Sequence, residues 1–284
     1  MKTRVITGAV VTLFMLAVVA LYATPAFAIS ISVICAMAVF ELLRVFDSHK
    51  QYPISVPAYV IAAAMPTVAY VMLKVLGKPA ADFIIVLALT FFVFLFYCFF
   101  VAVFKRGKYN FATLAASFML SMYAICCFTS LCVINYVEGM GIFSVGMVFI
   151  GAWVSDVFAY FTGRLLGKHK LIPEVSPKKT IEGSIGGTLF CILSFVVFGL
   201  IVDKFFSMNA NFVFLAISGL VVSILAQVGD LIMSVIKRQY GVKDYGKIFP
   251  GHGGVLDRFD SILATSLAMC AVCVFASLFN IQLI

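Results

Sequence analysis

Charged residues are scarce in this sequence, making up only 11% of its 284 positions. A soluble domain carries roughly a quarter charged residues and is about half apolar, whereas 64% of this chain is hydrophobic. Tryptophan occurs once, and phenylalanine 30 times. This balance excludes one large water-soluble core and predicts an all-α polytopic membrane protein.

The sequence also lacks the patterns of nucleic-acid-binding and disulfide-stapled proteins. Its net charge of +8 comes from basic residues in short loops, which form no continuous face, so no nucleic-acid partner is expected. Most of its eight cysteines lie inside apolar runs, where thiols behave as small hydrophobic groups. Cys270 and Cys273 have CxxC spacing, but no second pair or nearby histidine accompanies them, which disfavours a metal or redox site.

About nine apolar runs are long enough to cross a bilayer. The first, Val5 to about Leu21, imitates a signal peptide that would be cleaved after Ala28, and cleavage is the alternative. We interpret it as a retained helix, because its removal would invert the charge pattern of the loops. The other predicted spans are 26–46, 54–73, 82–104, 110–136, 140–163, 183–202, 211–236 and 259–281.

The basic residues predict how these spans are oriented. With a cytoplasmic N-terminus, all but three of the 20 Lys and Arg residues fall in cytoplasmic segments, the exceptions being Lys74, Lys78 and Lys204. This asymmetry favours nine spans and a C-terminus outside.

Two regions are expected from the distribution of polar residues. Residues 1–140 have the pattern of ordinary membrane helices, and residues 141–284 form a catalytic region with two cytoplasmic motif loops, 164–182 and 237–258. In the first region Glu41 is the one carboxylate inside a span, and Arg44, three residues on, is its predicted partner.

The first polar motif begins in a membrane helix. Asp156, Tyr160, Gly163 and Gly167 share one helical face if the helix continues that far. A carboxylate inside a membrane helix is costly and indicates function, the alternative being a buried pair with Arg164.

The segment SPKKTIEGSIGG, Ser176–Gly187, favours an anion site. Prolines bar a regular helix before Lys178, and Thr180 is placed to cap the helix that follows. Helix N-terminal amides beside Lys178 and Lys179 would attract a phosphate, although the lysines alone are also typical of a cytoplasmic loop. The glycines of the segment permit close helix packing.

The second polar motif carries three aspartates. Asp230 lies on one helical face with Ser234 and Lys237, while Asp257 and Asp260 are three residues apart at the start of the last helix. Carboxylates brought together repel one another unless a cation holds them, and hard oxygen ligands suit Mg²⁺. We therefore predict metal ligation by Asp230, Asp257 and Asp260.

Each of these aspartates also has a simpler interpretation. Asp257 could cap the last helix, and Asp260 could pair with Arg258 or Lys237. His252 could serve as a general base or a phosphate hydrogen-bond donor, or only shape its glycine-rich turn.

The pattern S-x-x-K-R-x4-K-D-x-G-x3-P-G-H-G-G-x-x-D-R-x-D, Ser234–Asp260, resembles the signature of the phosphatidate cytidylyltransferase (CDP-diacylglycerol synthase) family. Ser176–Gly187 is similar to that family's second conserved region. The resemblance covers about residues 151–265, and residues 1–140 share only their hydrophobicity and basic loops.

The resemblance implies that CTP and phosphatidate react to give CDP-diacylglycerol and pyrophosphate. It also implies Mg²⁺, with a monovalent cation such as K⁺ as a further helper, and a homodimer in a bacterial-type inner membrane with its active site facing the cytoplasm. The residues it assigns to catalysis are Asp230, Lys237, Arg238, Lys243, Asp244, His252, Asp257 and Asp260. Those it assigns to substrate binding are Asp156, Arg164, Ser176, Lys178, Lys179, Thr180, Glu182, Ser234 and Arg258. The alternatives are a polyprenol or phytol kinase that uses CTP, and a transporter.

Overall fold

The computed structural model describes residues 13, 15–281 and 283, apart from 47, 106–107, 137–140, 250 and 252. The chain divides into two compact units. The first unit consists of residues 1–136 and 240–258, and the second unit of residues 137–239 and 259–284.

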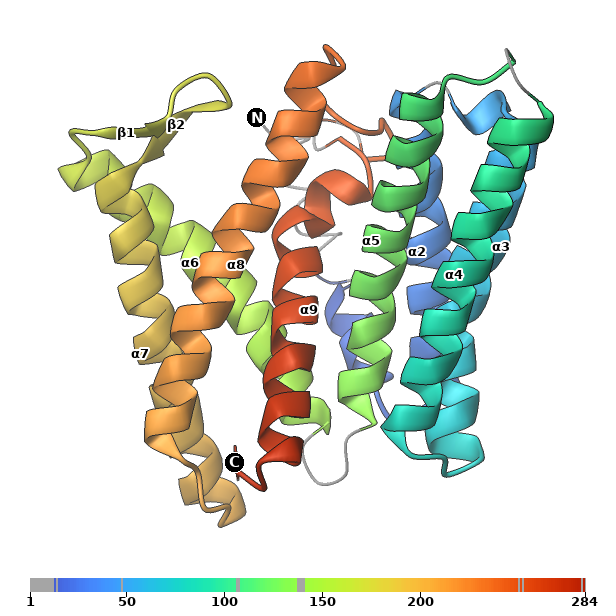
Figure 1. Cartoon of the computed structure of the whole chain (residues 1–284). Helices are drawn as coiled ribbons and strands as arrows, with labels where there is room; N and C mark the ends of the chain where they lie inside the picture. The colour runs from blue at the N-terminus through green and yellow to red at the C-terminus, as the bar shows by residue number, and fades with distance from the viewer. Residues whose placement is uncertain are drawn as a thin grey trace. The chain divides into compact units, whose positions relative to one another are not determined.

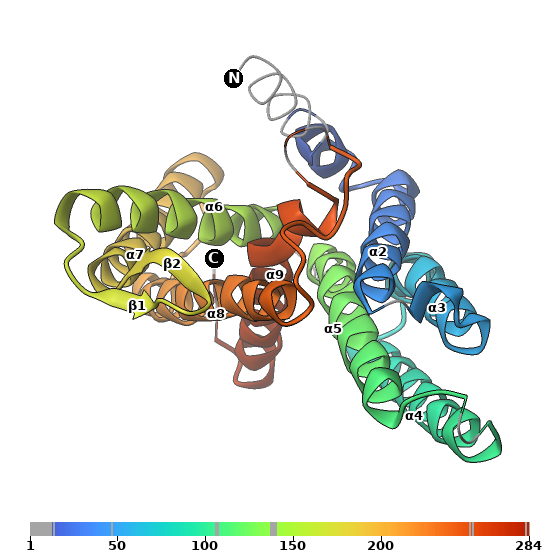
Figure 2. The same ribbon diagram turned by 90° about the horizontal axis from the view of Figure 1, so that it is seen from above.

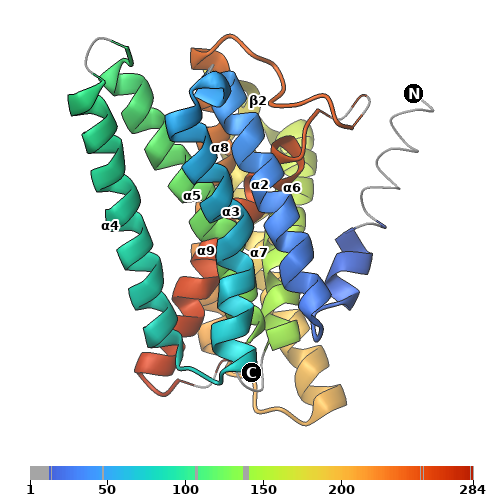
Figure 3. The same ribbon diagram turned by 90° about the vertical axis from the view of Figure 1, so that its right-hand side faces the viewer.

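The described residues of the first unit form four long helices, of which α2 packs on α3 and α5, and α4 packs on α5 (Figure 3). They are α2 (Pro25–Val45), α3 (Tyr52–Tyr70), which a π-helical turn continues over Val71–Val75, α4 (Ala80–Phe104) and α5 (Phe111–Asn135). A 3-10 turn, Ser48–Lys50, joins α2 to α3.

Within the first unit, α5 is the central helix and α4 is the most exposed one. The most apolar window of α5 is 83% buried, whereas that of α4 is only 17% buried. Small polar residues let α5 pack closely, and buried Ser117 donates a hydrogen bond to Ser48 Oγ at 3.0 Å. The almost wholly apolar α4 has the composition of a helix that faces lipid.

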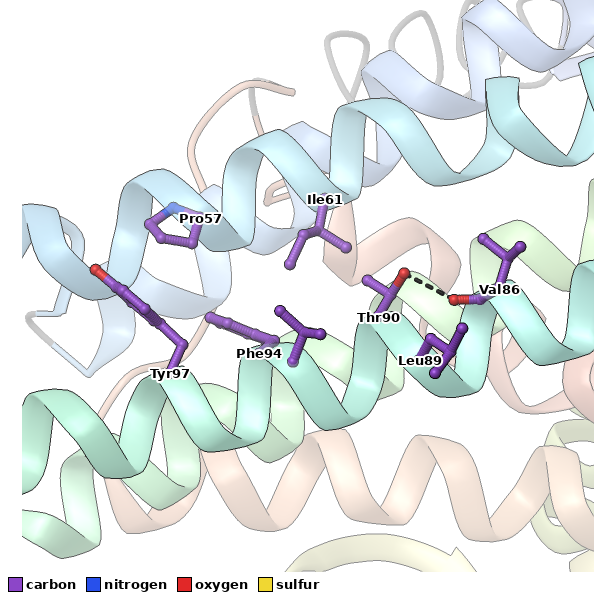
Figure 4. A pocket seen from close by; sticks show the side chains of 8 residues that line it. Pro57, Ile61, Val86, Leu89, Thr90, Phe94 and Tyr97 are labelled. Carbon is purple, nitrogen blue, oxygen red and sulfur yellow. Dashed lines mark hydrogen bonds between the residues drawn. The ribbon is translucent and has the colours of Figure 1, made fainter.

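An apolar groove of about 440 Å³ lies between α3 and α4 in the first unit (Figure 4). Thr90 of α4 lines this groove, and its hydroxyl donates a hydrogen bond to the Val86 carbonyl at 2.8 Å. The groove is lined by Pro57, Ile61, Val86, Leu89, Thr90, Val93, Phe94 and Tyr97. None of the described residues that line it carries a charge, so it is unsuited to a phosphate group.

In the second unit α6, α7 and α8 pack side by side, and the β1–β2 hairpin lies at one end of α6 and α7 (Figures 1 and 2). The elements are α6 (Gly141–Leu166), β1 (Lys170–Ile172), β2 (Ser176–Thr180), α7 (Ile181–Phe206), α8 (Phe212–Gln239) and α9 (Leu256–Leu278), whose first turn belongs to the first unit.

Glycines bring α6 and α7 close together, as expected from the sequence. A Cβ added at Gly187 would lie 2.6 Å from the Ser155 carbonyl, and one at Gly183 would lie 2.6 Å from the Ala159 carbonyl. Larger residues at these positions would push the two helices apart.

Eight helices among the described residues are long and apolar enough to cross a membrane, and they match eight predicted spans to within a few residues. The predicted first span, Val5–Leu21, falls largely outside the described residues. The all-α prediction is confirmed, and the chain is an integral membrane protein.

The hairpin was not predicted. Its strands pair antiparallel, Lys170 with Thr180 and Ile172 with Ser176. The prolines of this segment exclude a helix but do not specify a strand. The predicted face of α6 also ends sooner than expected, because α6 stops at Leu166, before Gly167.

Candidate active site

A cavity of about 560 Å³ opens in the second unit, where the hairpin meets α6, α7 and α8. Six of the nine predicted substrate-binding residues line it together, although their sequence positions span 25 residues from α6 to the start of α7. They are Asp156, Arg164, Ser176, Lys178, Lys179 and Thr180. Tyr160, Gly163, Lys170, Leu171, Gly183, Ser184, Gln227 and Ala159 complete the lining.

The hairpin runs directly into α7, and this transition places the two motif lysines. Thr180 is the N-cap of α7, and its Oγ1 accepts the Gly183 N–H at 3.1 Å, which confirms the predicted cap. Lys178 and Lys179 are neighbours on β2, and both line the cavity. Lys178 is exposed and Lys179 is half-buried.

Lys179 forms an ion pair with Asp230 of α8. Both side chains are partly shielded from solvent, with 28% and 22% of their surface exposed. A half-buried pair interacts more strongly than one in open water. The contact therefore joins the first polar motif to the second.

Three carboxylates of the second unit lie close enough to repel one another: Asp156 on α6, Asp230 on α8 and Asp260 on α9. Asp156 Oδ2 accepts a hydrogen bond from Ser261 Oγ at 2.7 Å. The Lys237 ammonium lies near enough to Asp260 to offset part of the repulsion, in line with the simpler interpretation of Asp260.

These donors fit a Mg²⁺ ion that also binds phosphate. Among the described residues, no three His, Cys, Asp or Glu side chains stand close enough to chelate one ion. Mg²⁺ typically takes one or two carboxylates and completes its shell with water and substrate phosphate oxygens. Asp230 and Asp260 can supply such an open set, whereas a closed structural metal site is not formed by the described residues.

A polar network next to Asp230 ties α8 to α7. Gln227 Nε2 donates to Thr188 Oγ1 at 3.0 Å and to Ser223 Oγ at 3.3 Å. Ser184 Oγ donates to Gln227 Oε1. The sequence predicted no role for these residues. A glutamine inside an apolar helix nevertheless indicates hydrogen-bond partners on a neighbouring helix.

Other predicted residues of the second unit have partners outside the cavity or lie at its margin. Glu182 accepts the His169 N–H at 3.2 Å and contacts His169 Nδ1 at 2.7 Å, which joins the hairpin to α7. Arg238 Nε donates to the Val175 carbonyl at 3.4 Å. Ser234 lies half-buried one turn beyond Asp230 on α8.

In the first unit, Asp257 is 6% exposed and serves the loop that precedes α9. Its Oδ2 accepts the Tyr245 N–H at 2.8 Å and the Gly254 N–H at 2.9 Å. This agrees with the interpretation of Asp257 as a residue that stabilises the helix start, and its role as a metal ligand stays a prediction. Lys243 and Asp244 of this loop are exposed, as is Arg258 in the first turn of α9. His252 lies outside the described residues.

Glu41 has backbone partners that were not predicted, while the predicted partner Arg44 lies near enough to attract its carboxylate. The Glu41 side chain is 1% exposed, and its two oxygens accept the N–H groups of Val255 at 3.0 Å and Leu256 at 2.8 Å. Arg44 instead donates to the Tyr245 carbonyl at 2.7 Å. A carboxylate inside a membrane helix indicates that it has a partner. The three-residue spacing between Glu41 and Arg44 favoured a pair within α2, so the loop amides were not predicted.

The fold and the cavity define an integral membrane protein with a basic, carboxylate-bearing site suited to phosphate groups. Residues 2–276 match the sequence model of the Cytidylyltransferase family. The chain belongs to that family. It is 33% identical over 270 residues to a protein of Bacillus subtilis named phosphatidate cytidylyltransferase, a match that covers 93% of this chain and 94% of the relative.

Two matches over a shorter stretch have a higher identity. A Staphylococcus haemolyticus protein with the same name is 49% identical over 115 residues, which are 40% of this chain and 43% of the relative. A Staphylococcus aureus protein, also of that name, is 50% identical over 115 residues, with the same coverage.

Proposed function

We propose that the chain transfers the cytidylyl group from CTP to phosphatidate, which yields CDP-diacylglycerol and pyrophosphate. The observation that carries this proposal is the likeness, over 93% of the chain, to a protein named phosphatidate cytidylyltransferase. The basic cavity supports it, because a phosphate-rich substrate pair requires several cations in one place.

The reaction needs no protein nucleophile. A phosphate monoester carries about −1.5 to −2 charges near neutral pH. An oxygen of the phosphatidate phosphate attacks the α-phosphorus of CTP, a new P–O bond forms, and the bond from the α-phosphorus to the oxygen bridging to the β-phosphorus breaks. Pyrophosphate leaves with that bond's electron pair. Catalysis is then positioning and charge neutralisation.

The basic residues around the cavity support this proposal. Lys178, Lys179 and Arg164 line the cavity, and the N-terminus of α7, capped by Thr180, opens beside them. We assign these groups to the phosphates of CTP and phosphatidate. The acyl chains would stay in the bilayer, since the helices that line the cavity, α6, α7 and α8, are long and apolar enough to cross a membrane.

Asp230 and Asp260 would hold a divalent ion, and we propose Mg²⁺. When bound, this ion supplies positive charge to phosphate oxygens. K⁺ as a second, monovalent helper is a further proposal. Lys179 would keep the charge of Asp230 compensated, as its ion pair with that residue indicates.

The orientation in the membrane is also proposed. CTP is a cytoplasmic nucleotide, and the charge asymmetry of the loops favours a cytoplasmic N-terminus and a C-terminus outside. We propose a plasma-membrane homodimer whose cavities face the cytoplasm. Reporter fusions at each loop test the orientation, and light scattering of the purified protein tests the dimer.

The first experiment is a product assay with purified protein in mixed micelles. It uses CTP labelled with ³²P at the α-phosphate, phosphatidate and Mg²⁺, with and without EDTA and K⁺. A chloroform-soluble labelled product that requires phosphatidate and disappears with EDTA is expected. Label that stays in aqueous CDP would indicate a kinase. Absence of turnover, with substrate movement across sealed vesicles, would indicate a transporter.

A further inference from the structure

The start of α9 is capped by a residue of α2 that lies far away in the sequence. Glu41 accepts the N–H groups of Val255 and Leu256, from which it is separated by 214 and 215 positions. α9 begins at Leu256, and the first amides of a helix have no partner within the helix. Glu41 therefore satisfies, from another helix, the first amide of α9 and the amide that directly precedes it.

Arg44 holds the other side of the same loop. Its guanidinium donates to the carbonyl of Tyr245, whose own N–H donates to Asp257 Oδ2 at 2.8 Å. Tyr245 is fully buried in the first unit. Arg44 and Asp257 are thus linked through one residue of the loop.

Two motif glycines are explained by the position of the Glu41 carboxylate. A Cβ added at Gly246 or at Gly254 would collide with Glu41 Oε1. The loop backbone therefore lies directly against the carboxylate at both Gly246 and Gly254. Such tight contact leaves the loop little room to shift while Glu41 stays in place.

We propose that Glu41 and Arg44 are positioning residues that fix the start of α9 and thereby orient Asp257 and Asp260, which that helix carries. Both oxygens of the Glu41 carboxylate accept a backbone N–H, and burial leaves these amides no water to replace the lost bonds. The proposal rests on the proposed function, because it assigns Asp260 to the reaction.

The test is Glu41→Gln, which keeps the size of the side chain but replaces one of the two acceptor oxygens with an amide group that can only donate. Its matched control is Ser117→Ala, which removes a buried hydrogen bond to Ser48 in the same unit, away from the loop. Hydrogen–deuterium exchange of the amides of Val255 and Leu256 should accelerate in Glu41→Gln but not in Ser117→Ala. The kcat should fall about 100-fold, as expected for a displaced catalytic group, with KM for both substrates little changed.

Arg44→Gln is the second variant, since Arg44 is exposed and its replacement should leave the fold intact if Glu41→Gln does not fold. It should show the same pattern with a smaller loss of kcat. The proposal is overturned if either folded variant keeps wild-type exchange and kcat, or if Ser117→Ala loses as much kcat as Glu41→Gln. The exchange measurement needs no turnover, so it remains decisive even if the wild-type protein makes no CDP-diacylglycerol.

Discussion

The carboxylates of the two units have different kinds of partners. In the first unit Glu41 and Asp257 are buried, and each accepts two backbone N–H groups. In the second unit Asp156, Asp230 and Asp260 lie close to one another and to lysine ammonium groups. The former carboxylates hold a loop, whereas the latter lie beside lysines, where a cation or a phosphate-bearing substrate can bind.

This difference indicates that the groups an aspartate contacts, more than its position in a motif, distinguish a catalytic role from a structural one. Asp257 and Asp260 are three residues apart on α9, and the sequence pattern treats them alike. The structure assigns Asp257 Oδ2 to loop amides, while Asp260 interacts with Asp230 and Lys237. Substitutions that remove one partner at a time can test this distinction.

The largest effect is expected from Asp260→Asn. Removing this charge takes away a proposed Mg²⁺ ligand and should lower kcat at least about 10²–10³-fold while the protein stays folded. Turnover of labelled CTP and thermal unfolding should be measured together. Asp82→Asn, at the start of α4 in the other unit, is the control and should remain active. Near-normal turnover of Asp260→Asn would contradict the catalytic role that distinguishes Asp260 from Asp257.

A smaller effect is expected from Lys179→Gln. It removes the partner of Asp230 and one cation from the cavity, so kcat/KM should fall about 10²-fold. Lys178→Gln, its neighbour on β2, is exposed and should lose less. Initial rates at varied CTP concentration decide the order. A greater loss in Lys178→Gln would mean that the Lys179–Asp230 pair is unimportant for turnover.

Much of the fold was predictable because a bilayer allows few solutions. An apolar run of about 20 residues can cross hydrocarbon only if its backbone is hydrogen-bonded internally, which requires a helix. Eight spans followed from this rule alone. The hairpin did not, since Pro173 and Pro177 exclude a helix without specifying which residues pair.

The site was predictable only where local geometry determines it. Helical spacing correctly placed Asp156, Tyr160 and Gly163 on one face, and cap chemistry correctly placed Thr180. The contact between Glu41 and the loop was missed, because spacing within one helix carries no information about a partner 214 residues away.

An intermediate effect on stability is expected from Gly254→Ala. The added methyl group would collide with the Glu41 carboxylate, so unfolding should become easier by about 1–3 kcal/mol. Gly146→Ala is the control, since its Cβ would meet only Phe198 at 3.6 Å, an ordinary contact. Denaturant unfolding compares the two. Equal stability of both variants would show that the loop does not pack against Glu41 as described.

The smallest effect is expected from Glu182→Gln, although the sequence placed Glu182 among the substrate-binding residues. Its carboxylate accepts a backbone N–H of His169, as the carboxylates of the first unit accept loop amides. If the partner decides the role, this residue supports the hairpin, and an exposed pair of this kind contributes little. Turnover and KM for CTP should stay close to wild type, with proteolysis of the hairpin somewhat faster. A large rise in KM for CTP would instead show that Glu182 contacts the substrate. Bonding to backbone N–H groups would then indicate a structural role only for buried carboxylates.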